Sequence, residues 1–166
     1  MPQTFHPDPV TWRRGVRICL DWGKARIGVA ACDPDGVLAY PVETIRNGPG
    51  ELERVRARIQ ALVAEFDAIE VLMGLPTDLR GQQGPAALAI REIAGLLAAT
   101  LEVPLRLVDE RLTTAVASRQ LAEAGRSSRQ RRTVIDQAAA VAILENALEV
   151  ERRTGGPVGD TVLPSR

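Results

Sequence analysis

VRICLDWGKARIGVAACDPDG, residues 16–36, decides the fold of this chain. Val16 to Trp22 and Ile27 to Cys32 are short apolar stretches, which are typical of buried β-strands. Asp33-Pro34-Asp35-Gly36 predicts a turn that leads to a third strand, Val37 to Val42. We therefore expect the chain to begin with three antiparallel strands.

The pattern then alternates between the helix period and the strand period. Apolar residues recur every three to four positions from Leu52 to Phe66, which predicts an amphipathic helix, and a strand is expected at Ile69 to Gly74. Pro85 can begin a second helix that continues to Leu101, before a strand at Leu105 to Asp109. Because strands that alternate with helices pair in parallel, an α/β fold is expected.

Two further helices are expected after the last strand, from about Thr113 to Ala124 and from about Thr133 to Glu149. Residues 125–132, which lie between them, are polar and rich in arginine and show no periodicity. This composition predicts a mobile loop.

Length and charge limit the class of protein. The chain has 166 residues, with 21 Lys and Arg against 21 Asp and Glu, which fits one domain, expected at 15–151 between flexible tails at 1–14 and 152–166. The zero net charge argues against a surface that is basic all over. No membrane span or signal peptide is apparent, so we expect a cytoplasmic protein without a membrane partner. Cys19 and Cys32 are expected to be buried free thiols.

Asp21 is a charged residue within an apolar strand, directly before Trp22 and Gly23. Burying a single carboxylate is costly unless the group is paired or binds a cation. An ion pair with Arg26 or Lys24 is the structural alternative to a metal site.

Three more carboxylates lie near predicted ends of strands and helices. Asp109 and Glu110 end the last strand, at the edge where open α/β sheets bind ligands, although they could be two loop carboxylates near Arg111. Asp136 follows Thr133 by three residues, so it could instead be an acid of a variant capping box.

If the first strand is central, Asp21, Asp109, Glu110 and Asp136 could converge at one edge of the sheet. Carboxylates without histidine suit Mg²⁺ or Mn²⁺, and the single histidine of the chain lies in the N-terminal tail. Two such ions about 3.5 to 4 Å apart would stabilise both the attacking and the leaving oxygen of a phosphodiester displacement.

Four blocks of sequence, in order and at compatible spacing, resemble the YqgF/RuvX family, whose members are described as pre-16S rRNA nucleases or Holliday-junction-resolvase-like proteins. The resemblance covers about residues 16 to 150. The blocks are Ile18 to Gly23 with Arg26 to Ala30, Gly74-Leu75-Pro76 continuing to Gly81 and Gly84-Pro85, Asp109 to Thr114, and Val134-Ile135-Asp136.

This resemblance implies a ribonuclease H-like fold, with a central mixed five-stranded sheet in the order 3-2-1-4-5 flanked by helices. It also implies a metal-dependent phosphodiesterase that acts on structured nucleic acid. Carried over position by position, Asp21, Glu110 and Asp136 are the expected catalytic and metal-binding acids. Asp109 is either a further metal ligand or a residue that contacts the ligands and not the metal.

Basic residues near these acids are candidate substrate contacts. The loop from Gly74 to Pro85 permits close backbone approach to a phosphate, although it could be an ordinary turn between strand and helix. The arginine-dense segment could position RNA or DNA beside Asp136, although an arginine-rich composition alone would also produce it. The candidate contacts are Arg80, Arg111, Arg126, Arg129, Arg131 and Arg132.

The sequence thus predicts a Mg²⁺- or Mn²⁺-dependent endonuclease that matures the 5′ end of 16S rRNA. The carboxylate pattern and the resemblance together indicate the chemistry, and the resemblance alone indicates the structured RNA substrate, pre-16S rRNA. One alternative is a Holliday junction resolvase that acts on branched DNA. Another is a non-catalytic nucleic-acid-binding factor in ribosome assembly or transcription. The protein is expected to be a monomer or a homodimer.

Overall fold

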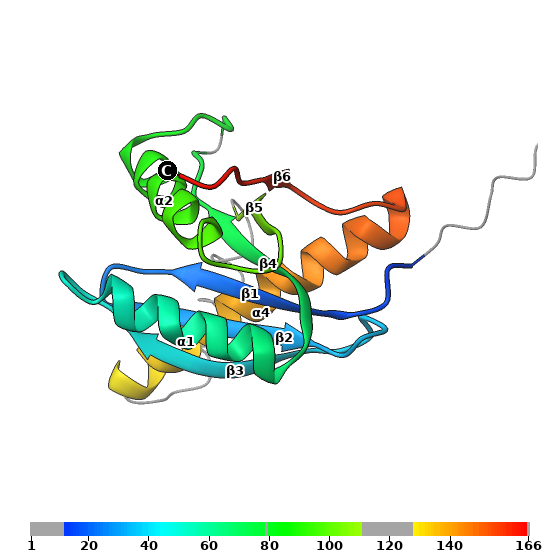
Figure 1. Ribbon diagram of the computed structural model, residues 1–166, viewed down its shortest axis with the longest axis horizontal. Coiled ribbons are helices and arrows are strands. Elements are labelled where there is room, and N and C mark those ends of the chain that lie inside the picture. The colour runs from blue at the N-terminus through cyan, green and yellow to red at the C-terminus, as the bar shows by residue number, and fades with distance from the viewer. Residues whose placement is uncertain (1–11, 79, 111–127, 166) are drawn as a thin grey trace, which may run out of the picture.

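The computed structural model describes residues 12–78, 80–110 and 128–165, and for 128–133 it describes the backbone only. One open sheet has the strand order β3-β2-β1-β4-β5-β6 (Figure 1). β1, β2 and β3 are antiparallel neighbours, β1, β4 and β5 are parallel, and β6 is antiparallel to β5. The strands are β1 Val16–Trp22, β2 Arg26–Cys32, β3 Ala39–Arg46, β4 Ala68–Leu75, β5 Leu105–Asp109 and β6 Asp160–Thr161.

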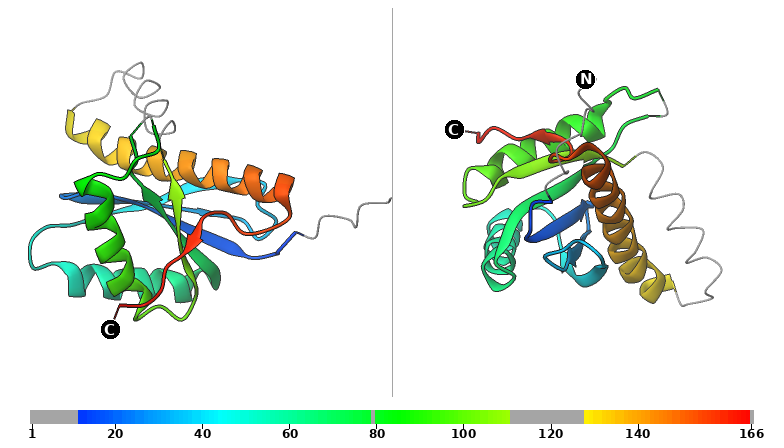
Figure 2. Two further views of the ribbon diagram at one scale, coloured as in Figure 1. Left: turned by 90° about the horizontal axis from the view of Figure 1, so that it is seen from above. Right: turned by 90° about the vertical axis from the view of Figure 1, so that its right-hand side faces the viewer.

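Helices cover both faces of the sheet (Figure 2). Helices α1 and α2 lie on one face, and α4 lies on the other. α2 begins at Pro85, as expected for a proline in the first turn of a helix. The helices are α1 Leu52–Glu65, α2 Pro85–Ala98 and α4 Ser128–Thr154. Within the described ranges, no helix is long and apolar enough to cross a membrane.

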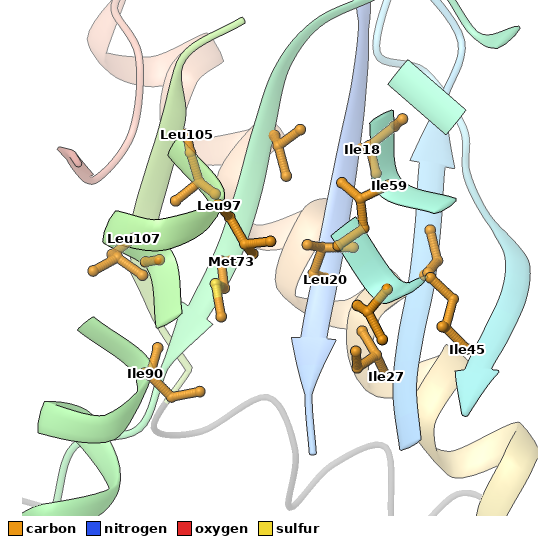
Figure 3. Close-up of a cluster of buried hydrophobic side chains, with 14 of the residues drawn as sticks. Ile18, Leu20, Ile27, Ile45, Ile59, Met73, Ile90, Leu97, Leu105 and Leu107 are labelled. Carbon is orange, nitrogen blue, oxygen red and sulfur yellow. The ribbon is translucent and has the colours of Figure 1, made fainter. Parts of the chain in front are cut away.

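Side chains of β1 alternate between two hydrophobic cores, because successive residues of a strand point to opposite faces. Ile18 and Leu20 pack toward α1 and α2, in the cluster shown in Figure 3. Cys19 belongs to the second cluster, under α4, together with Ala140 and Leu144 of that helix. Both cores are built on the central strand, so the position of β1 is fixed from both sides.

The β2–β3 turn confirms the expectation for Asp33-Pro34-Asp35-Gly36. The Asp33 carboxylate accepts hydrogen bonds from the backbone N–H groups of Asp35 and Leu38, at 3.1 and 2.7 Å. The third strand, however, begins at Ala39 and not at Val37. Val37 and Leu38 are 81% and 62% exposed, so their apolar character does not place them in the sheet.

The last helix begins earlier than predicted. α4 includes residues 128–132, so the prediction of a mobile arginine loop is wrong for that part. Arg and Gln are good helix formers, and a polar first turn needs no apolar periodicity. Asp136 consequently lies about two turns inside the helix, which excludes the capping-box interpretation. The helix expected at 113–124 lies outside the described residues.

A sixth strand extends the predicted five-stranded order. β6 pairs with β5, and the next residue, Val162, donates its N–H to the carbonyl of Leu105 at 2.8 Å. Ser165 donates its backbone N–H to the carbonyl of Gly95 in α2 at 3.0 Å. Part of the segment expected as a flexible C-terminal tail therefore hydrogen-bonds to the domain. A strand of two residues is too short to show a period in the sequence.

Charged residues are buried at the beginning of β1, under α4. Arg17 is fully buried and donates two hydrogen bonds to the Glu151 carboxylate of α4, both at 3.1 Å. Its Nε lies 3.7 Å from Glu70 of β4 and has no hydrogen-bond partner. Arg13 and Arg106 donate further hydrogen bonds to Glu70. These five residues, here called the buried ion cluster, join α4 to the sheet at the end opposite Asp21.

Candidate active site

A row of three residues crosses the sheet near the end of β1. Asp21 of β1 is the register partner of Gly28 in β2, and Gly28 is in turn the register partner of Thr44 in β3. A Cβ atom at position 28 would overlap the backbone carbonyl of Asp136 in α4. The missing side chain of Gly28 therefore lets α4 lie directly on the sheet, beside Asp21. Gln137 supports this contact by donating a hydrogen bond of 3.0 Å to the Thr44 hydroxyl.

Asp21 lies on the α4 face of β1, two residues after Cys19. Within the described part of the chain, its carboxylate has no hydrogen-bond or ion-pair partner. Burial raises the pKa of Asp21 to about 6, and the negative charge of Asp136 contributes to this rise. Asp21 is thus a desolvated carboxylate next to a like charge, a condition that a bound cation would relieve.

Glu110 follows β5 and shares the α4 face with Val108. A Cβ atom at Gly74 in β4 would overlap its Oε2 atom, so this glycine provides space for the carboxylate. The pKa of Glu110 is raised to about 7 by burial and by the charges of Asp21 and Asp109. Glu110 and Asp136 therefore lie on either side of Asp21, with β4 and β2 beneath them.

Asp109 differs from the other three acids. It shares the opposite face of β5 with Leu107, and its carboxylate accepts a hydrogen bond of 3.0 Å from the Thr77 hydroxyl. Strand alternation thus directs Asp109 away from α4. It contributes negative charge near Glu110 without belonging to the group formed by Asp21, Glu110 and Asp136, which is here called the acidic group.

Arg26 is a cation beside the acidic group. Its Nε donates a hydrogen bond of 2.9 Å to Oδ2 of Asp136. The ion pair that the sequence left open for Asp21 is therefore made by Asp136 instead. The Arg26 side chain is 36% exposed, so it is accessible from solvent.

The acidic group fits a divalent cation by its chemistry. It supplies carboxylate oxygens only, it is partly desolvated, and two of its members carry raised pKa values because they are buried and because they repel their neighbours. Among the described residues, no three acidic, cysteine or histidine side chains lie close enough together to form a metal-binding cluster. The structure thus brings the three acids to one face and one end of the sheet, but their side chains are not close enough together to form such a cluster.

Cys19 and Cys32 are both buried free thiols, as predicted. Burial, together with the charges of Asp21 and Glu110, raises the pKa of Cys19 well above its ordinary value. A thiol held in its neutral form is a poor nucleophile and a poor metal ligand. Cys19 therefore packs beneath the acidic group and does not extend it.

The basic residues predicted as substrate contacts lie in different parts of the chain. Arg80 is exposed in the loop after β4, where its backbone N–H donates to the Asp78 carboxylate at 2.9 Å. Arg111 and Arg126 lie outside the described residues. Arg129, Arg131 and Arg132 belong to the first turns of α4, before Asp136, and only their backbone is described.

Sequence reasoning did not identify Arg46 as a basic residue near the acidic group. It named Lys24 only as a possible ion-pair partner of Asp21. Arg46 is the register partner of Arg26, and Lys24 lies in the β1–β2 turn. The available signal was the short sequence Lys24-Ala25-Arg26, which follows Asp21 after Trp22 and Gly23 and places two cations at the start of β2. The pattern itself indicates these cations only as ion-pair partners for Asp21.

The sequence is similar to known proteins over most of its length. Residues 15–150 match the family model described as "RuvX: Holliday junction resolvase". A Streptomyces coelicolor protein named "Putative pre-16S rRNA nuclease" is 50% identical over 163 residues, which cover 97% of this chain and 96% of the relative. A protein of the same name from Thermobifida fusca is 54% identical over 158 residues, covering 90% of this chain and 97% of the relative.

The fold also has a solved counterpart. The structure entitled "T. thermophilus RuvC in complex with Holliday junction substrate" matches with a TM-score of 0.55 at 18% identity, covering 86% of this chain and 98% of that one. At this identity the likeness concerns the fold alone. The predicted ribonuclease H-like α/β fold is therefore confirmed, with six strands in the sheet where five were expected.

Proposed function

The chain belongs to the RuvX family, and from this membership we propose that it is a metal-dependent endonuclease that matures the 5′ end of 16S rRNA. The observation that carries the proposal is Asp21, a partly buried carboxylate without a hydrogen-bond or ion-pair partner among the described residues, between the charges of Asp136 and Glu110. Such an arrangement is costly for folding, which is typical of a site that binds a cation. The names of the relatives support the rRNA substrate.

Asp21, Glu110 and Asp136 would hold Mg²⁺ or Mn²⁺. When bound, the ion supplies positive charge for the phosphate and lowers the pKa of a water molecule. The chain itself orients the ligands: Gly28 lets Asp136 approach Asp21, Gly74 makes room for Glu110, and Arg26 holds one oxygen of Asp136. Because burial lowers the local dielectric constant, these carboxylates attract a bound cation more strongly than they would in water.

A cleavage assay with matched variants tests this proposal. Purified wild-type protein, Asp21→Asn and Asp67→Asn are incubated with RNA that contains the 16S precursor 5′ end, with Mn²⁺ or with EDTA. Asp67 is an exposed acid in the turn after α1, so its variant controls for the loss of one charge. We expect wild type and Asp67→Asn to cleave only with Mn²⁺, and Asp21→Asn to be at least about 100-fold slower. Equal cleavage by Asp21→Asn, or no cleavage by wild type, would reject the proposal.

A second candidate function is the resolution of four-way DNA junctions, which the description of the family model favours. The same proteins are therefore tested on a synthetic junction with labelled arms. Paired nicks that depend on Mn²⁺ and on Asp21, with the RNA left intact, would establish a resolvase. A non-catalytic binding factor predicts instead that Asp21→Asn supports ribosome assembly in cells as well as wild type does.

A further inference from the structure

Three basic residues lie together where the antiparallel strands end, next to the acidic group. Arg26 and Arg46 are register partners at the ends of β2 and β3, and Lys24 lies in the turn between β1 and β2. Register partners in antiparallel strands project from the same face of the sheet, with Cβ atoms about 4.5 to 5.5 Å apart. Lys24, Arg26 and Arg46, here called the basic edge, therefore adjoin the face that carries Asp21 and Asp136.

The pairing of two cations across neighbouring strands is unfavourable for folding. Asp136 compensates Arg26 through one hydrogen bond from Nε, which leaves the other guanidinium N–H groups of Arg26 without a partner among the described residues. Arg46 and Lys24 are exposed and form no ion pair or side-chain hydrogen bond within the described ranges. By contrast, eight described arginines, from Arg13 to Arg106, are ion-paired.

The backbone that carries the basic edge is fixed by hydrogen bonds. Asn47 donates from its backbone N–H to the carbonyl of Ala25 and from Nδ2 to the carbonyl of Gly23, both at 2.8 Å. Arg54 of α1 donates to the carbonyl of Arg46 and pairs with Glu51 at 2.7 Å. The cations are thus presented from a constrained turn, so binding an anion there costs little backbone entropy.

We propose that the basic edge binds the phosphodiester backbone of the substrate and holds one strand against the acidic group. This inference rests on the proposed nuclease function and assigns residues to its substrate contact. Two arginines at register-paired positions suit contacts with neighbouring phosphate oxygens, and Lys24 adds a point charge. Arg26 is a positioning residue as well, because it contacts Asp136, and as the register partner of Arg46 it projects from the same face of the sheet.

Salt-dependent binding without divalent metal tests the proposal. The double variant Lys24→Gln/Arg46→Gln is compared with Arg14→Gln/Arg153→Gln, which removes two exposed cations from the opposite end of the molecule. The probe is fluorescein-labelled RNA with the 16S precursor 5′ end, titrated in EDTA at several KCl concentrations. We expect the slope of log K against log salt to decrease in magnitude by about 2 for the basic-edge variant only. A charge-retaining variant, Lys24→Arg/Arg46→Lys, should keep the wild-type slope.

The outcomes separate this inference from the proposed function. An unchanged slope in Lys24→Gln/Arg46→Gln, an equal loss in the control, or no RNA binding by wild type would each overturn the basic edge as a binding surface. The assay contains no metal and needs no cleavage, so it does not depend on Asp21. A reduced slope together with an absence of cleavage would retain the basic edge and reject the nuclease.

Discussion

Asp21 makes the stability of the metal-free protein depend on pH. Its pKa is raised from 3.8 to about 6 in the folded protein, so the folded state holds its proton more tightly than the unfolded chain does. The stability that follows from this difference is fully present below about pH 4 and is lost as pH rises through about 6. Glu110, with a pKa raised to about 7, acts in the same direction.

We therefore expect Asp21→Asn to be more stable than wild type at pH 8 in EDTA, by about 2 to 3 kcal/mol, and by less than about half of that at pH 4.5. Urea unfolding at the two pH values measures this difference. Taking the difference between variant and wild type cancels the titration of groups that do not interact with Asp21. A constant difference across the pH range would show that Asp21 is not destabilised by its surroundings.

Gly28 is expected to be intolerant of any side chain. Gly28→Ala would place a methyl group on the Asp136 carbonyl, so α4 must move away from the sheet or the strand must bend. We expect a loss of about 2 to 4 kcal/mol in the free energy of unfolding, because overpacking against backbone cannot be relieved by a rotamer change. Gly156→Ala, where nothing lies within 4 Å of the added atom, is the matched control. Equal unfolding midpoints would disprove the close contact.

Strand alternation alone could have separated the predicted acids. By alternation along the strands, Asp21 lies on the same face of the sheet as Cys19, and Glu110 lies on the same face as Val108. Asp109 lies on the opposite face, with Leu107. The sequence therefore contained the information that Asp109 faces away. The Arg26–Asp136 ion pair joins residues 110 positions apart, and no local pattern indicates which of two nearby acids an arginine will contact.

α4 connects the acidic group with the buried ion cluster. Asp136 and Glu151 lie on the same helix and are separated by roughly 22 Å along its axis, at 1.5 Å per residue. At the C-terminal end of α4, Glu151 accepts hydrogen bonds from Arg17 and Arg13. Nearer its N-terminal end, the close approach of Asp136 to Gly28 holds the helix against the sheet. The buried ion cluster therefore helps to fix the helix that carries Asp136.

Removal of one charge from this cluster should be costly. In Glu151→Gln the fully buried Arg17 guanidinium loses the carboxylate that accepts two of its hydrogen bonds. Among the described residues Glu70 then remains as its only anionic partner, beside the Gly15 carbonyl. We expect the free energy of unfolding to fall by about 3 kcal/mol, because an incompletely compensated buried charge remains. Glu149→Gln, at an exposed position of the same helix, should change it by less than about 0.5 kcal/mol. Equal effects of the two variants, measured by urea unfolding, would contradict this role.

Elements with a clear period were predictable, and elements without one were not. The succession of β1 to β5 and of α1 and α2 along the chain followed from apolar spacing, because each buries one face or one stripe, whereas the order of the strands in the sheet was implied by the family resemblance. The polar start of α4 and the two residues of β6 have no such spacing. The buried ion cluster was also missed, since Arg17, Glu70 and Glu151 become neighbours only when β1, β4 and α4 pack together.

The balanced net charge of the chain conceals a segregation of charge in the folded molecule. The acidic group lies at one end of the sheet, bordered by the basic edge, and the buried ion cluster lies at the other end. Zero net charge therefore argues only against strong nonspecific attraction to long nucleic acids. It is compatible with local recognition of a phosphodiester beside carboxylates.

A divalent ion should stabilise the whole fold through the acidic group, since a ligand that binds only the native state raises its stability. At 100 times its dissociation constant, Mn²⁺ would contribute about 2.7 kcal/mol, which corresponds to an increase in Tm of roughly 5 to 10 °C. The increase should be smaller at pH 5 than at pH 8, because Asp21 and Glu110, with pKa values of about 6 and 7, are then largely protonated. Differential scanning fluorimetry of wild type, Asp21→Asn and Asp67→Asn measures it. Asp67→Asn should keep the increase and Asp21→Asn should lose it, and an equal increase in all three proteins would place the ion elsewhere on the molecule.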